Sequence, residues 1–393
     1  MPSTLDCDVL VIGGGIHGVG AAQAAAAAGY EVVLLEQSHL AAGTSSRSSK
    51  LIHGGLRYLE SAQFALVRES LHERELLLKL APTIVKRRSF FIPVYPATSR
   101  RPWLMRIGLG MYWMFAGMGE FARFGSVPRS QWQDLDGLNT HGLQQVFKYW
   151  DAQTDDVSLT QAVMRSARDL GAQLICPARF ESAEITRDMC NVRYSAGSGI
   201  RQIKAAAVIN AAGPWARGVA GRFSPSLPDL DVENVQGAHL ELPGKIERGC
   251  YYVEAPGDKR ATFVMPWKND TTLLGTTEHK YNGDPGAVEP LPEETVYLLE
   301  IYHHYFPERS TEVLNQWAGL RVLPSEKRSA FARSRETQLP VDNEDRPRVV
   351  SVFGGKLTTY RATSLQVMGL LKRTLPEVRA RADTSELPLQ LAD

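Results

Sequence analysis

Residues 9–36, VLVIGGGIHGVGAAQAAAAAGYEVVLLE, decide the fold of this chain. An apolar run breaks at glycines, an alanine-rich segment follows, and a second apolar run ends on Glu36. This order predicts a strand, a tight glycine turn, a helix and a second strand that closes on an acid. The stretch therefore predicts an α/β fold whose first part is Rossmann-like.

Gly13, Gly15 and Gly18 have the G-x-G-x-x-G spacing that binds the pyrophosphate of a dinucleotide. One glycine makes the sharp turn, one lets phosphate approach the backbone, and one lets the helix lie close to the strand. Free N–H groups at the helix start then face the phosphate oxygens. Glu36 stands where a carboxylate accepts hydrogen bonds from ribose hydroxyls. The stretch predicts a bound dinucleotide and leaves open whether it is a flavin or a nicotinamide.

The bulk composition narrows the function classes. The chain has 393 residues, 44% of them hydrophobic and 22% charged, which is ordinary globular composition for two or more domains. The formal net charge of +1 argues against a dedicated nucleic-acid binder. The 4 cysteines form no C-x-x-C pair, which favours a reducing, cytoplasmic setting over a disulfide framework or zinc cluster. Asp6 and Asp8 interrupt the N-terminus, so it does not read as a signal peptide.

The segment 103–118, WLMRIGLGMYWMFAGM, is the most apolar stretch outside the first unit. It contains Arg106 and is too short and interrupted for a membrane-spanning helix. Tryptophans, methionines and flanking arginines are typical of a helix that lies in a membrane interface, but a buried cap helix has the same pattern. The interfacial alternative predicts a peripheral protein on the inner face of the cytoplasmic membrane.

The rest of the chain predicts an interleaved organisation. The segment 235–274 alternates in β fashion, whereas 208–213 and 349–353 are apolar strands that run into glycine turns. We predict a Rossmann-like dinucleotide domain from residues 1–75, 150–225 and 340–393. A substrate or cap domain with a mixed or antiparallel sheet and helices (α+β) then takes residues 76–149 and 226–339.

Several motifs in one order give a family resemblance. Together they closely resemble the FAD-dependent glycerol-3-phosphate dehydrogenases, within the wider D-amino-acid-oxidase-like flavoproteins. The stretches that carry it are the fingerprint at 13–18, SSRSSKLIHGGLRYL at 45–59, VINAAGPW at 208–215, 237–239, 263–267 with 275–277, and SVFGGKLTTYR at 351–361.

The resemblance implies FAD as the cofactor and places many residues beside it. The implied cofactor-binding residues are Gly13, Gly15, Ile16, His17, Gly18, Glu36, Gln37, Thr44, Ser45, Ser46, Ser49, Lys50, Leu51, His53, Gly54, Gly55, Ala211, Gly213, Trp215, Gly354, Gly355, Lys356, Leu357, Thr358 and Thr359. It implies oxidation of sn-glycerol 3-phosphate to dihydroxyacetone phosphate by hydride transfer to flavin N5, with electrons passed to a quinone.

The resemblance also implies a substrate pocket. Arg57, Arg321 and Arg335 match the pocket arginines, and arginine suits a phosphate because its planar fork meets two oxygens. Lys356 would favour negative charge on the flavin and on a developing alkoxide. His53 and His239 are the candidates for proton transfer, and Arg321 or Lys356 could share that role.

Departures from the family keep alternatives open. Gln236 stands where a lysine is usual, Val322 stands where proline is usual, and the helical C-terminal domain usual in the family is expected to be missing. An oxygen-using oxidase of glycerol 3-phosphate, or of a related hydroxy or amino compound, is the enzymatic alternative, and a non-catalytic flavin subunit is the other. His303-His304 lacks a third ligand at a recognisable spacing, so we predict no metal site. The oligomeric state is left open.

Overall fold

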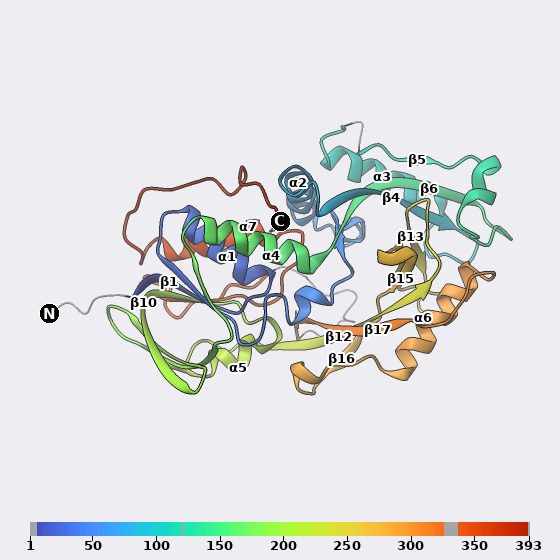
Figure 1. Cartoon of the computed structure of the whole chain (residues 1–393). Helices are drawn as coiled ribbons and strands as arrows, with labels where there is room; N and C mark the ends of the chain where they lie inside the picture. Colours follow the sequence, from blue (N-terminus) through green and yellow to red (C-terminus); the bar gives the residue numbers. More distant parts are fainter. Residues whose placement is uncertain (1–5, 120–121, 326–336, 392–393) are drawn as a thin grey trace.

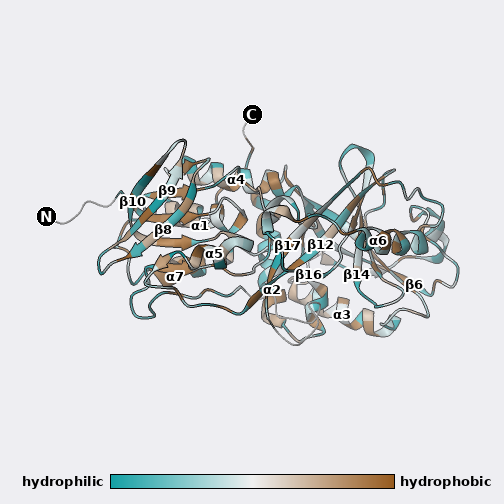
Figure 2. Ribbon diagram, turned by 90° about the horizontal axis from the view of Figure 1, so that it is seen from below, coloured by the Kyte–Doolittle hydropathy of each residue, from teal (hydrophilic) through white to brown (hydrophobic). Residues whose placement is uncertain are grey.

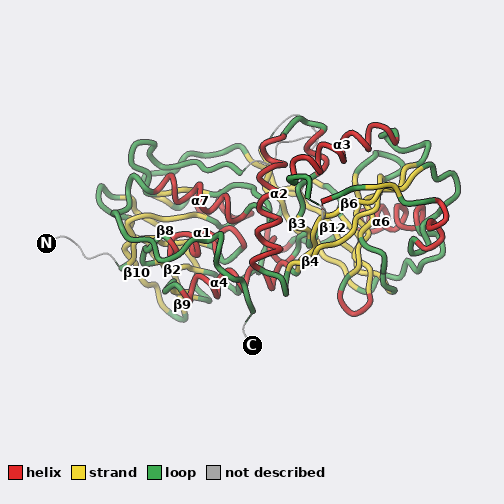
Figure 3. The backbone as a smooth tube through the Cα atoms, turned by 90° about the horizontal axis from the view of Figure 1, so that it is seen from above, coloured by secondary structure: helices red, strands yellow, loops and turns green. Residues whose placement is uncertain are grey.

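The computed structural model describes residues 6–119, 122–325 and 337–391. Figure 1 shows an elongated molecule in which two sheets lie end to end, with helices α1, α4 and α7 over the first sheet. Helix α2 (Phe64–Leu80) lies at the junction between the two halves, and Figure 3 shows it there from another side. The α/β fold class predicted from residues 9–36 is confirmed, with a second, mixed sheet beside it.

The first sheet is built on five parallel strands in the order β7-β2-β1-β10-β18. An antiparallel extension, β9 and β8, continues from the first half of β10, and the short β11 pairs with β8. The strands are β1 (Cys7–Ile12), β2 (Val32–Leu35), β7 (Gln173–Ile175), β8 (Arg179–Ile185), β9 (Cys190–Ala196), β10 (Gly199–Asn210), β11 (Phe223–Ser224) and β18 (Val349–Ser351).

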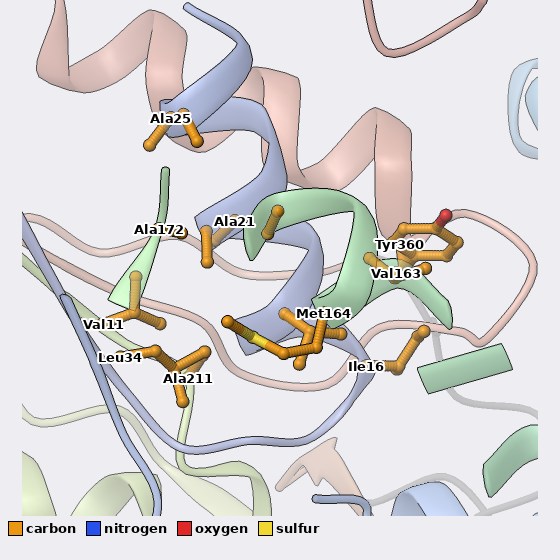
Figure 4. Close-up of a cluster of buried hydrophobic side chains, with 14 of the residues drawn as sticks. Val11, Ile16, Ala21, Ala25, Leu34, Val163, Met164, Ala172, Ala211 and Tyr360 are labelled. Carbon is orange, nitrogen blue, oxygen red and sulfur yellow. The ribbon is translucent and has the colours of Figure 1, made fainter. Parts of the chain in front are cut away.

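Three helices cover one face of this sheet: α1 (Ile16–Ala27), α4 (Asp156–Asp169) and α7 (Tyr360–Leu371). Helix α1 is buried almost all round because α4 and α7 pack on both of its sides, which explains its alanine-rich sequence. A Cβ on Gly20 would lie 2.5 Å from the ring of Tyr360, so the approach of α7 depends on small residues. Figure 4 shows Val163 and Met164 of α4 and Tyr360 of α7 around α1.

The second sheet follows the order β16-β12-β15-β14-β13-β4-β6-β3, with β17 also pairing β12 and β5 pairing β6. All its pairs are antiparallel except β13 with β4. Its strands are β3 (Leu51–Ile52), β4 (Val85–Val94), β5 (Gly125–Ser126), β6 (Gln145–Thr154), β12 (Val232–Pro243), β13 (Cys250–Glu254), β14 (Ala261–Pro266), β15 (Thr271–Gly275), β16 (His279–Tyr281) and β17 (Asn315–Pro324).

Helices cover both faces of the second sheet. Helix α6 (Pro292–Tyr305) buries Leu298 and Tyr302 in one core cluster. On the opposite side α2 and α3 (Pro102–Phe115) bury Leu71 and Leu109 in another cluster. The short helix α5 (Ala216–Ala220) comes after β10 of the first sheet along the chain.

The two sheets alternate along the chain, in the interleaved manner predicted. The strand β3 joins the second sheet, although the sequence placed residues 1–75 with the first. Likewise β6 stays in the second sheet as far as Thr154. The domain boundaries themselves stay a prediction.

Helix α3 is amphipathic. It buries Met105, Leu109 and Tyr112 against the second sheet. Its other face exposes large apolar side chains, namely Trp103, Leu104, Ile107 and Met114. Figure 2 shows brown, hydrophobic colour on this helix at the edge of the molecule. Within the described ranges no helix combines the length and apolar character needed to cross a membrane.

Candidate active site

The glycine turn after β1 forms a close-packed cradle at the junction of the halves. Gly13 has φ +106°, and a Cβ there would lie 2.7 Å from the carbonyl oxygen of Ala211. A Cβ on Gly18 would lie 1.8 Å from the carbonyl oxygen of Gly13. Glycine is therefore required at both positions, one for its backbone conformation and one for close approach.

Hydrogen bonds fix the polar groups around this turn. Glu36 Oε2 accepts the Gly14 N–H at 2.7 Å and its Oε1 accepts the Ser38 N–H at 2.8 Å, which holds the carboxylate at the end of β2. Ser45 Oγ accepts the Ile16 N–H at 2.9 Å at the start of α1. The first turn of α1 carries no acidic residue, so its positive N-terminal potential is available to an anion.

A cavity of about 960 Å³ runs from this turn to the second sheet. It is bordered by most of the residues that the sequence singled out: Gly13, Gly15, Ile16, His17, Glu36, Gln37, Thr44, Ser45, Ser49, Leu51, His53, Gly55, Arg57, Ala211, Gly213, Trp215, His239, Arg321, Gly354, Gly355, Lys356, Leu357 and Thr358. Gly18, Ser46, Lys50, Gly54 and Thr359 are not among its lining residues. Arg335 lies outside the described residues.

Three cationic side chains that the sequence singled out line the cavity. The Lys356 ammonium lies 3.9 Å from the ring centroid of Tyr58, and the Arg57 guanidinium carbon lies 5.9 Å from the same ring. Arg321, on β17, pairs with Glu278 at 2.9 Å and donates to the Thr277 carbonyl at 2.8 Å. All three cations line the same cavity, where they can meet an anionic substrate.

His239, on β12, is held in a tight, dry environment. Its Nε2 lies 2.9 Å from Ser49 Oγ, and its ring stacks on Trp317 with centroids 5.8 Å apart. Burial lowers the pKa of His239 to about 3, with further lowering from the positive charges of Lys50 and Arg321. His239 is therefore neutral at ordinary pH.

The loop 53–55 lines the cavity with His53 and Gly55. The His53 N–H donates to Thr358 Oγ1 at 3.1 Å, which ties this loop to the turn before α7. Gly55 adopts φ +75°, the left-handed region, and a 3-10 turn follows directly. The geometry brings both candidate histidines and the three described cations to one cavity, at the end of the glycine cradle.

Comparison with known proteins shows the family to which a chain with this glycine turn and cavity belongs. The family model "FAD dependent oxidoreductase" matches residues 8–359. The chain belongs to the FAD-dependent oxidoreductase family. It is 39% identical to a glycerol-3-phosphate dehydrogenase of Pseudomonas aeruginosa, over 90% of this chain and 69% of the relative. It is 36% identical to a D-erythritol 1-phosphate dehydrogenase of Brucella abortus, over 95% of this chain and 75% of the relative.

Solved structures share the fold of this flavoenzyme. The glycerol-3-phosphate dehydrogenase of Bacillus halodurans, complexed with FAD, superposes with a TM-score of 0.77 at 24% identity, over 99% of this chain and 68% of that one. An L-α-glycerophosphate oxidase of Mycoplasma pneumoniae with FAD gives a TM-score of 0.74 at 17% identity, over 94% and 95%. The resemblance drawn from the motifs, and FAD as the cofactor, are confirmed.

The residues of the flavoenzyme fit FAD chemically. The cradle of Gly13 and Gly18 and the acid-free N-terminus of α1 suit the pyrophosphate, and Glu36 still has lone pairs for ribose hydroxyls. His17 lines the cavity, and its buried Nδ1 has no hydrogen-bond partner among the described residues. A buried polar atom of this kind calls for a polar ligand atom beside it.

Sequence reasoning missed several polar residues that line the cavity. Arg260 and Glu278 lie at the second-sheet end, and Asp151 lies in the wall beside the loop 53–55. Glu278 directly follows the G-T-T stretch at 275–277, which was a usable signal. Asp151 and Arg260 stand in no motif, and only the pairing of distant strands brings them to the site. Among the described residues, no group of three metal-ligating side chains occurs.

Proposed function

We propose that this flavoenzyme oxidises sn-glycerol 3-phosphate to dihydroxyacetone phosphate. The observation that carries the proposal is that Arg57, Arg321 and Lys356 all line the cavity that also contains the glycine turn. A phosphorylated polyol satisfies such cations, whereas an uncharged alcohol does not. The relatives named as glycerol-3-phosphate dehydrogenases support this substrate.

In this proposal the cations bind and orient the substrate. Arg57 and Arg321 bind the phosphate with paired N–H donors, and Arg335 remains a predicted third arginine. Lys356 lies closest to the turn before α7 and stabilises the negative charge that develops on the reacting oxygen. Glu278 holds Arg321 in its orientation through the ion pair at 2.9 Å.

The proposal gives the two histidines different tasks. Bound FAD supplies the acceptor for the hydride. His239 is a poor proton acceptor because burial lowers its pKa to about 3, so it serves as a neutral hydrogen-bond partner that Ser49 orients. His53 then accepts the hydroxyl proton, since it lines the same cavity on a loop tied to Thr358.

A longer phosphorylated polyol is the second candidate substrate. The 36% identity to a relative named D-erythritol 1-phosphate dehydrogenase favours it. Glu278 and Arg260 also line the cavity, and their polar groups could meet additional hydroxyls. Comparing the two substrates side by side therefore belongs in the first experiment.

The electron acceptor and the membrane contact complete the proposal. We assign a membrane quinone as the acceptor and the exposed apolar face of α3, Trp103, Leu104, Ile107 and Met114, as the surface that meets the bilayer. Oxygen as acceptor is the alternative and would yield hydrogen peroxide in air. Peroxide measured with and without added quinone separates the two.

The proposed substrate is tested by anaerobic addition of glycerol 3-phosphate while the flavin absorbance is followed. We expect rapid bleaching, none with glycerol, and a kcat/KM lowered by about 10- to 100-fold in Arg321→Ala, the range for losing hydrogen bonds to a charged group. Arg217→Ala is the matched control, because Arg217 pairs with Asp229 on the surface and does not line the cavity. A flavin that stays oxidised with glycerol 3-phosphate and bleaches with erythritol 1-phosphate would favour the second candidate. Oxidised flavin with both would overturn the phosphate assignment.

A further inference from the structure

A buried polar cluster lies directly behind the loop 53–55. The Gly54 N–H donates to Tyr112 Oη at 2.8 Å and lies 3.3 Å from Asp151 Oδ1. The Tyr112 hydroxyl is 2.7 and 2.8 Å from the two Asp151 carboxylate oxygens, and it donates to that carboxylate. Arg74 Nη1 donates to Asp151 Oδ1 at 2.6 Å. The cluster thus ends on a backbone amide of a loop whose neighbouring residues line the flavin cavity.

The cluster comes from three distant elements. Arg74 lies on α2, Tyr112 on α3 and Asp151 on β6, and all three side chains are almost fully buried. A buried ion pair recovers its desolvation cost only when further hydrogen bonds satisfy its members. Here the Arg74 guanidinium also donates to the Trp150 carbonyl and to Glu75, so both charges are satisfied.

The position of the loop 53–55 is restricted by close packing. A Cβ on Gly54 would lie 2.5 Å from both Tyr112 Oη and Leu71 Cδ2, so α2 and α3 press on it from behind. The preceding amide, that of His53, donates to Thr358 Oγ1. Two consecutive amides of the loop are therefore fixed by side chains from opposite sides. His53 stands between these two anchors.

We propose that Tyr112, Asp151 and Arg74 act as positioning residues that set the place of the loop 53–55 relative to the bound flavin. Asp151 lines the cavity, but its oxygens already accept from Arg74, Tyr112 and Gly54, which suits a support better than a proton acceptor. Tyr112 is the adjustable member, because its hydroxyl both accepts from the loop and donates to the carboxylate. The kinetic part of this inference rests on the proposed substrate; the part concerning the flavin does not.

Tyr112→Phe is the perturbation of choice because it removes only the hydroxyl. The Gly54 amide is then left with the longer approach to Asp151, and the loop can shift toward the cavity. We expect kcat to fall between about 10- and 100-fold, the usual scale for a small misplacement of a reacting group, while KM changes by less than about twofold. Asp151→Asn should have a similar effect.

Tyr251→Phe is the matched control. Tyr251 is fully buried and donates to the partly buried Asp136 at 2.7 Å, so it forms a second tyrosine–aspartate bond, but it does not line the cavity. The visible circular dichroism of bound FAD reports the flavin environment without any substrate. We expect this spectrum to change in Tyr112→Phe, with FAD still bound stoichiometrically, and to stay as in the parent in Tyr251→Phe.

The outcomes separate the inference from the proposed function. If the parent enzyme were inactive on glycerol 3-phosphate, the proposed substrate would be wrong. The circular dichroism of bound FAD would still test the role of the cluster. The positioning role would be overturned by an unchanged flavin spectrum in Tyr112→Phe. It would also be overturned if Tyr112→Phe lost activity only in proportion to lost FAD and to the same extent as Tyr251→Phe. In a double-mutant cycle the pair Tyr112→Phe with Asp151→Asn should cost little more than either change alone, because both act through one contact. Additive losses would contradict that.

Discussion

Replacing Gly18 by alanine should damage the flavoenzyme at a single, defined contact. The new Cβ would lie 1.8 Å from the carbonyl oxygen of Gly13, whereas a carbon–oxygen contact normally needs roughly 3.3 Å. The turn must therefore open by about 1.5 Å, and the obstacle is backbone that no rotamer change can remove. Overpacking of this kind costs about 1–3 kcal/mol, and we expect a value near the upper end. Since FAD binding needs the turn in place, about 3 kcal/mol would weaken FAD binding by roughly 100-fold.

The assay is urea unfolding together with the FAD dissociation constant measured by flavin fluorescence. Gly369→Ala is the control, because Gly369 lies in α7 and a Cβ there would meet nothing within 4 Å. The same chemical change should then stabilise the protein by about 0.5–1 kcal/mol, since alanine is the better helix former. The two variants should thus shift stability in opposite directions. If Gly18→Ala bound FAD within twofold of the parent, the close approach of helix and turn would not be what the cofactor requires.

Two further predictions concern pH and the surface. Burial lowers the pKa of His17 to about 4 and that of His239 to about 3, so the unfolded chain binds protons that the folded one does not as pH falls below about 6.5. The free energy of unfolding should be at its full value above that pH and fall on acidification by up to about 1.4 kcal/mol per pH unit for each histidine. In His239→Asn, urea unfolding should show a shallower dependence of this free energy on pH. An equal dependence would refute the prediction. Ile107→Glu should weaken binding to anionic vesicles about tenfold in sedimentation, because Ile107 is exposed on the apolar face of α3. Leu314→Glu should not weaken it, because Leu314 is exposed outside α3. Equal binding by the two variants would show that α3 is not the contact.

Local sequence signals were enough for the first half of the fold. The glycine turn, the alanine helix and the acid-ended strand follow from contacts between residues close in the chain, and β2 ends at Leu35, directly before Glu36. Errors arose where strands end. The strand predicted over 208–213 stops at Asn210. Gly213 has φ +55°, and the side-chain amide of Asn210 donates to the Ala216 carbonyl at 2.8 Å. A polar turn inside an apolar run is not visible in hydrophobic periodicity.

The cavity shows the same division between near and distant contacts. At one end the glycine turn, the start of α1 and Glu36 come from one contiguous motif, which is why the sequence predicted a dinucleotide there. Its second end joins β6, β12 and β17, so the bonds from Ser49 to His239 and from Arg321 to Glu278 link residues far apart in sequence. Residue type gives no hint of such pairs; only the family resemblance pointed to His239 and Arg321, and nothing pointed to Asp151 or Tyr112.

This division has a physical consequence for how such a chain changes its substrate. The FAD end is constrained by backbone contacts that admit only glycine at Gly13 and Gly18, so little can vary there. The second end is held by side-chain pairs such as Arg321 with Glu278, each of which can be replaced without moving the cradle. The relatives are named for different phosphorylated polyols, which such an arrangement permits. A specificity change should therefore map to residues around Glu278 and Arg260, on β14 to β17, and leave the affinity for FAD unaltered.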